Sequence, residues 1–143
     1  MTAWAHLPNA ALIDEVLASV RTSPGKWGAA RDAARGAAWD TAWDTAWDAA
    51  WDAAWDAAWH TARSAARNAA WQAVQNAVWG VARGAAWDAA RGTVAALVAY
   101  DDADQFMKLP AEHLQRLYRI DPHPMFLLLQ PAAIVFGGRA AAP

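Results

Sequence analysis

The sequence predicts an all-α protein, and three features of its middle part support this fold class. First, seventeen consecutive four-residue units fill positions 27 to 94. Second, alanine, the strongest helix former, occupies about half of each unit. Third, no glycine or proline interrupts positions 37 to 79. A β-strand is excluded because alanine is a poor strand residue, and a period of four would place the first residue of every unit on one face.

The four positions of the unit differ in chemistry, and their period does not match that of a helix. The first position holds ten Trp, six Arg and Gln75, the second is small or polar, and the third and fourth are almost all Ala. Four residues advance about 400° around an α-helix, so each first position lies about 40° beyond the one before it. Over about nine units, the line of Trp residues would therefore circle a straight helix completely.

Two arrangements accommodate this drift. The array is either one continuous helix that its neighbours wrap in a right-handed sense, or a set of packed helices of about three to five turns. We favour the broken array, packed as a bundle, because helices in compact domains average about 11–12 residues. The expected breaks are the Gly-rich stretch 80–92 and the region 60–64.

The segments on either side of the array are also predicted to be helical. Residues 1–26 hold a helix from Asn9 to Arg21, because Asn9 is a favourable N-cap and an apolar stripe follows it. The array and its continuation occupy residues 27–100. Residues 101–143 form a C-terminal helical module with an acidic turn, a helix from about Pro110 to Tyr118, and an apolar segment that Pro131 should kink or end.

Composition limits the classes of function. The net charge of -2 is not typical of a nucleic-acid-binding protein, and no uncharged apolar stretch reaches the length of a membrane span. The chain has no Cys, so disulfides and thiolate metal sites are excluded. The first residues lack a cationic region followed by an apolar run. We therefore expect a cytoplasmic protein without a signal peptide, with no nucleic-acid or membrane partner.

The chain resembles a group of uncharacterised alanine-rich tetrapeptide-repeat proteins of phages and bacteria. The matching residues are the run 96–102 (Ala-Leu-Val-Ala-Tyr-Asp-Asp) and Leu127 to Leu129, followed by Pro131, Ala132 and Phe136. Gln130 separates the leucine run from Pro131 here. The resemblance covers about residues 27–136 and implies no activity. A looser similarity to alanine-rich helical immunity-type proteins implies binding to a bacterial toxin.

The Trp residues are the candidate interface, because exposing a row of apolar indole rings to water is energetically unfavourable. Each Trp carries about 150–250 Å² of mostly apolar surface, and large aromatic and Arg side chains are the usual anchors of interfaces. A single isolated helix would expose these side chains to water, so the array must fold on itself, oligomerise or bind a partner. The predicted interface consists of Trp39, Trp43, Trp47, Trp51, Trp55, Trp59, Arg63, Arg67 and Trp71.

Charge is divided unequally along the array. An acidic ladder lies in its first half, at Asp40, Asp44, Asp48, Asp52 and Asp56. The second half carries several Arg residues, so an antiparallel pairing of the halves, within one chain or between two, would neutralise both. We expect Arg63 and Arg67 to face the ladder. The ladder's spacing of about 6 Å also suggests mimicry of nucleic-acid phosphates as an alternative.

Residues of catalytic or metal-binding chemistry are few. Asp101, Asp102 and Asp104, with His113 or His123, would suit a hard metal ion, but acidic residues between helices usually form a solvated turn. His60 occupies a slot otherwise held by Asp or Asn, which indicates a drifted repeat unit. No nucleophile triad or phosphate-binding loop is present. We therefore expect no enzyme, no metal and no cofactor.

The predicted function is that of a structural or interaction protein whose Trp/Ala repeat helices self-associate into a homo-oligomer. The alternative is an inhibitor or immunity-type protein that binds a macromolecular partner, possibly through the acidic ladder. A third class, an enzyme built on the C-terminal module, would require a cleft around Asp101 and His113. Duplication of a twelve-base DNA unit followed by drift would also generate the array without selection for a ligand.

Overall fold

The computed structural model describes residues 2–36, 41–107 and 109–137, without the side chains of 41–45, and it confirms the all-α class. Every regular element in this part of the chain is a helix. The helices are α1 (Ala10–Thr22), α2 (Pro24–Gly36), α3 (Thr41–Ser64), α4 (Asn68–Val81), α5 (Gly84–Ala99), α6 (Ala103–Met107), α7 (Ala111–Ile120), α8 (Pro124–Leu128) and α9 (Gln130–Val135).

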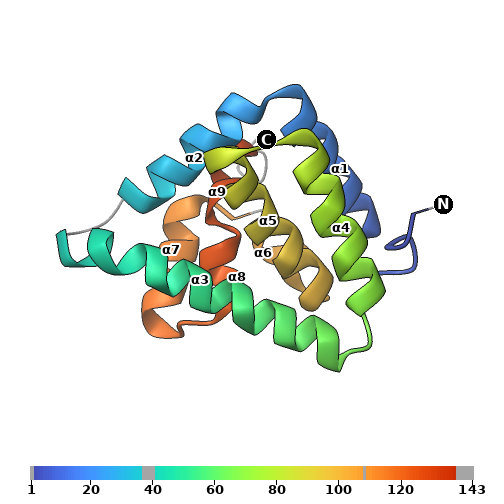
Figure 1. The fold of residues 1–143 in the computed structure, drawn as a ribbon. Coiled ribbons are helices and arrows are strands. Elements are labelled where there is room, and N and C mark those ends of the chain that lie inside the picture. The colour runs from blue at the N-terminus through green and yellow to red at the C-terminus, as the bar shows by residue number, and fades with distance from the viewer. Residues whose placement is uncertain (1, 37–40, 108, 138–143) are drawn as a thin grey trace.

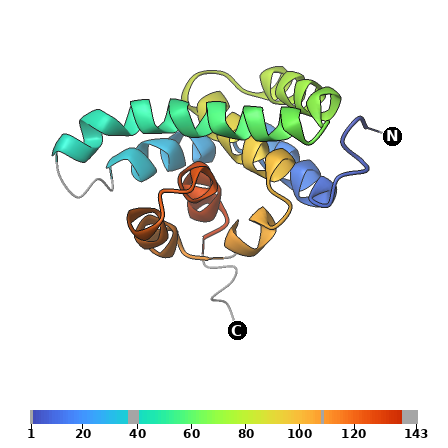
Figure 2. The same cartoon turned by 90° about the horizontal axis from the view of Figure 1, so that it is seen from below.

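Helix α5 lies at the centre of the fold, and the other helices pack around it (Figure 1). It contacts α1, α2, α3, α4, α8 and α9, and every residue from 92 to 99 is buried. Helix α3 crosses one side of the molecule, α8 packs against it, and α7 lies farther away on the other side (Figure 2). The array therefore forms its own core by surrounding its last helix with the earlier ones.

The array is broken into α2, α3, α4 and α5, as the second of the two arrangements predicts. Helix α3 is longer than expected, with 24 residues. It ends at Ser64, within the predicted region 60–64, and Ala66 in the turn that follows has a φ of 59°. The Ala66 N–H donates to Arg63 O at 3.1 Å, and the Arg67 N–H donates to Ala62 O at 2.9 Å. These two bonds form a Schellman motif, which satisfies the last carbonyls of α3.

The second break falls inside the predicted stretch 80–92. Ala82 and Arg83 are extended, and Gly84 has a φ of +62°, a left-handed conformation that glycine adopts without a steric penalty. The other two glycines of that stretch, Gly80 and Gly92, lie inside α4 and α5 and do not interrupt them.

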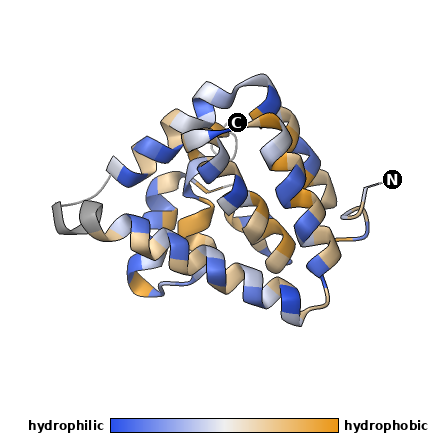
Figure 3. Ribbon diagram, viewed as in Figure 1, coloured by the Kyte–Doolittle hydropathy of each residue, from blue (hydrophilic) through white to orange (hydrophobic). Residues whose placement is uncertain are grey.

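Breaking the array reconciles its period with that of the α-helix. In α3, the buried positions are Trp47, Trp51, Ala54, Ala58 and Ala62, which follow the helical period of 3.6 rather than the repeat of four. The core-facing stripe thus moves from the first slot of the unit to the fourth. Each helix of the array ends before the drift carries the stripe completely around it. Hydrophilic residues consequently recur along the outer side of α3 (Figure 3).

The N-terminal helix forms nearly where the sequence predicts it, but Asn9 does not cap it. Its side chain makes no capping hydrogen bond to α1. The buried amide instead donates to the carbonyls of Leu97 and Tyr100, each at 3.0 Å. The reason is that α1 packs across the end of α5, whose last carbonyls have no partners within that helix.

The C-terminal residues pack into the same core as the array. The predicted helix 110–118 is α7, and the apolar segment forms α8 and α9, with Pro131 in the first turn of α9. Helices α8 and α9 contact α2, α3 and α5, and one hydrophobic cluster contains residues of all three predicted segments. Within the described part of the chain, no helix has the length and apolarity that a membrane span requires.

Candidate functional site

Most of the predicted interface residues lie in the core of the chain itself. Trp47, Trp51 and Trp71 are 0%, 1% and 2% exposed, and Trp55 and Trp59 are half-buried. The rings of Trp47 and Trp51 are stacked, with centroids 4.9 Å apart. The chain itself covers these three residues, because α3, which carries Trp47 and Trp51, and α4, which carries Trp71, both pack on α5. They are therefore not available as an exposed surface for a second copy. Trp39 and Trp43 lie outside the described side chains.

The described part of the acidic ladder faces arginines other than those predicted. Asp48 pairs with Arg35 at 3.2 Å and with Arg31 at 3.7 Å, and Asp52 pairs with Arg91 at 3.3 Å. Asp40 and Asp44 lie outside the described side chains. Pairing within one chain thus neutralises part of the ladder, and the Asp52 pair joins the two halves of the array as the sequence predicts.

Within the chain, Arg63 and Arg67 do not pair with the described part of the ladder. The guanidinium of Arg63 lies 5.0 Å from the centroid of the Trp59 ring. Arg67 lies in the turn after α3, where it donates to Val98 O at 2.9 Å and forms a bidentate ion pair with Asp101. The reason is that Arg63 lies on the same helix as the ladder and Arg67 lies in the turn that follows, so the fold does not bring either one opposite the ladder.

Asp88 is the centre of a charge network that the sequence did not indicate. Its carboxylate accepts hydrogen bonds from Arg31 Nε at 3.1 Å, Arg91 Nε at 3.0 Å and Trp51 Nε1 at 3.2 Å. Burial opposes the charge of Arg31, but its hydrogen bonds to Asp88 and Asp32 outweigh burial and raise the pKa of the guanidinium. The network joins α2, α3 and α5, so its role is structural.

A Trp/Arg patch, consisting of Trp79, Arg83 and Trp87, remains on the surface of α4 and α5. Trp79 is 52% exposed. The Arg83 guanidinium lies 3.8 Å from the Trp79 ring centroid, and the Trp87 ring meets Trp79 edge-on at 5.7 Å. Trp79 is eight residues beyond the buried Trp71, so the drift has turned it about 80° away from the core. The patch combines the exposed ring of Trp79 and the half-buried ring of Trp87 with a stacked cation.

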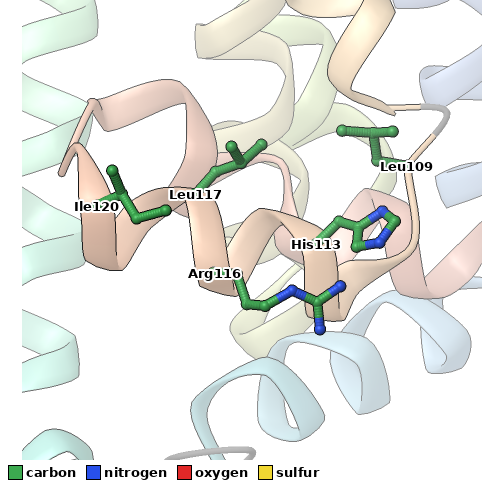
Figure 4. A pocket seen from close by; sticks show the side chains of 5 residues that line it. All are labelled: Leu109, His113, Arg116, Leu117 and Ile120. Carbon is green, nitrogen blue, oxygen red and sulfur yellow. The ribbon is translucent and has the colours of Figure 1, made fainter.

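A second exposed apolar feature lies along α7. Leu109, His113, Arg116, Leu117 and Ile120 line a hollow of about 340 Å³ (Figure 4). Ile120 is 83% exposed, whereas Leu114, on the other side of the same helix, is fully buried. The sequence analysis named His113 only as a candidate metal ligand. The repeated apolar residues at 109, 117 and 120 were the signal for this second face.

The acidic turn does not form a metal site. Asp101 pairs with Arg67, and this hydrogen bond holds the pKa of the Asp101 carboxyl below its usual value. His123 Nδ1 accepts from the Met125 N–H at 3.1 Å and so caps α8. Among the described residues, no group of three His, Asp or Glu is arranged to hold a metal ion.

The comparisons with known proteins do not assign this chain to a family. A scan against protein-family models and searches of curated proteins and of solved structures found no match to this chain. The resemblance to alanine-rich tetrapeptide-repeat proteins therefore stays a prediction.

Proposed function

We propose that the protein is a non-enzymatic interaction protein that self-associates through the Trp/Arg patch of its repeat helices α4 and α5. The observation that supports this proposal is the half-exposed Trp79, stacked by Arg83 and flanked by Trp87. Trp and Arg are the residue types that most often anchor interfaces. Self-association is thus assigned to a surface that the folded chain leaves open, rather than to the Trp residues that it buries.

The chemistry of the patch suits a second copy of the chain. In a two-fold dimer the same patch meets itself, so its groups must be complementary to one another. A patch that contains both indole rings and a guanidinium meets this condition, because the cation of each copy can stack on a ring of the other. Burial of Trp79 would also remove exposed apolar surface from water, which favours association by about 25 cal/mol for each Å² buried.

The test is the absolute mass by light scattering of the wild type and of Trp79→Ala. We expect a wild-type dimer that persists at high salt, because apolar and stacking contacts are not screened, and a Trp79→Ala monomer. Trp59→Ala is the matched control, since Trp59 also carries a stacked arginine one turn later but lies outside the patch. A wild-type monomer at all concentrations, or a Trp79→Ala variant with unchanged mass, would contradict the proposal.

The alternative function is binding to a basic macromolecular partner, as an inhibitor or immunity-type protein. The exposed Asp52 and Asp56 on the outer side of α3 favour this alternative. A monomeric wild type whose gene lies beside a toxin or defence gene would support it, and a salt-resistant dimer lost on Trp79→Ala would favour self-association.

A further inference from the structure

Helix α7 has one face in the core and one largely exposed face. Leu114 is 0% exposed and Gln115 9%, and they form the inner side. The outer side is here named the α7 seam and consists of the exposed His113, Arg116 and Ile120 together with Leu117, which is half-buried at its edge against the core. These four residues recur at i, i+3, i+4 and i+7, the spacing with which one helix packs along another. The seam is therefore shaped to receive a helix.

A helix of complementary chemistry lies elsewhere on the same molecule. The outer side of α3 carries Ala49, Asp52, Ala53 and Asp56, all exposed and again spaced i, i+3, i+4 and i+7. This set is here named the α3 acidic face. It lies opposite the buried stripe of that helix, so it points away from the core. Its alanines permit close approach of another helix, and its carboxylates supply negative charge.

We propose that the α7 seam of one copy docks onto the α3 acidic face of a second copy. The large side chains of Leu117 and Ile120 would pack against the small alanines, and Arg116 would pair with Asp52 or Asp56. Helices α3 and α7 lie on opposite sides of the molecule (Figure 2), so one copy cannot close this contact on itself. The contact is heterologous, and repetition joins copies head to tail in a ring or an open chain.

The charges needed for this contact are available. Arg116 and Asp56 are exposed and form no ion pair with any described residue. Glu112 lies one turn before Arg116 without pairing to it. The Asp52 side chain is 70% exposed although it contacts Arg91. Pairing across copies therefore breaks no internal ion pair of Arg116 or Asp56. This docking uses a surface separate from the Trp/Arg patch and goes beyond the function proposed above.

The test is a charge swap, made in the Trp79→Ala background so that the patch does not contribute. Arg116→Glu and Asp56→Arg each place like charges across the contact, and both positions are exposed, so folding is unaffected. We expect self-association of the parent chain at low salt and at least about tenfold weaker association of each variant alone. An equimolar mixture of the two variants should associate as the parent does, because each junction again pairs opposite charges.

Three results separate this proposal from the one before it. If both variants associate as strongly as the parent, or if the mixture does not recover, the docking of α7 on α3 is wrong. If the Trp79→Ala parent is monomeric at low salt while the wild type is a salt-resistant dimer, the docking is wrong and the patch contact stands. If Trp79→Ala has no effect and the charge swap behaves as expected, the patch contact is wrong and the docking stands.

Discussion

Replacing Gly92 with alanine tests the packing of α3 on α5, the contact that closes the core. An added Cβ would lie 2.2 Å from Trp51 Cζ2 and 2.6 Å from Trp51 Cη2. Carbon atoms in contact lie about 3.5–4.0 Å apart, so the ring would have to recede by about 1 Å or more. The ring is held by its stack on Trp47 and by its hydrogen bond to Asp88.

The expected effect follows from two opposing contributions. Overpacking of a core costs about 1–3 kcal/mol, and weakening of the Trp51–Asp88 hydrogen bond adds about 1 kcal/mol. In the opposite direction, alanine in place of glycine inside a helix stabilises the folded state by about 0.5–1 kcal/mol. We expect Gly92→Ala to lower the free energy of unfolding by about 1–3 kcal/mol, measured by urea denaturation followed by circular dichroism. The melting temperature should fall by about 3–12 °C.

Gly80→Ala is the matched control, because it makes the same substitution in the same slot of the repeat. No atom lies within 4 Å of a Cβ at Gly80, so only the helix preference remains and stability should rise by up to about 1 kcal/mol. In a Trp51→Ala chain, the additional penalty of Gly92→Ala should vanish. If Gly92→Ala stabilises the wild type as Gly80→Ala does, the Trp51 ring does not lie on Gly92 and the described packing of α3 is refuted.

Three further predictions concern the ends of helices. Ala66→Gly should stabilise the protein by about 0.5–1 kcal/mol in urea denaturation, because glycine adopts the left-handed conformation without the penalty of a Cβ; a loss of stability would contradict the Schellman turn. Asn9→Ala should cost about 1–3 kcal/mol by the same assay, since the carbonyls of Leu97 and Tyr100 lose a buried donor, and an unchanged midpoint would contradict that role. The pKa of Asp101 is lowered in the folded state, so its contribution is complete above the unfolded value and disappears as the pH falls through the folded value. Asp101→Asn should therefore be less stable than the wild type at neutral pH, by at most about 1 kcal/mol because the side chain is half exposed, and equally stable in acid; a difference independent of pH would contradict this.

The local properties of the repeat predict much of the fold. Alanine content predicts the helices. The mismatch between a period of four and 3.6 residues per turn leaves a wrapped helix or a broken array, and the usual length of helices favours the broken one. The same drift explains why Trp71 is buried whereas Trp79 is exposed once the bounds of α4 are known. The region 60–64 was predicted as a break, but neither glycine nor proline marks the turn at Ala66, and Arg67 holds that turn through distant groups.

The partners of individual side chains were beyond prediction from the sequence. Nearly identical units give no information on which helix meets which, so Asp88 could not be identified as the centre of the charge network. The same limit applies to the interface residues: the sequence requires Trp47 and Trp51 to be buried but does not say whether the same chain or another one covers them. The α7 seam was detectable from the apolar residues around His113.

The most direct test of the account is the dependence of unfolding on protein concentration in a chain that carries Trp79→Ala and Arg116→Glu. Both proposed contacts between copies are removed, and the Trp47–Trp51 core remains. The account predicts a monomer whose denaturant midpoint does not change with concentration, because α3 packs on α5 of its own chain. A midpoint that rises with concentration would contradict the account, since it would mean that the tryptophan core forms between chains.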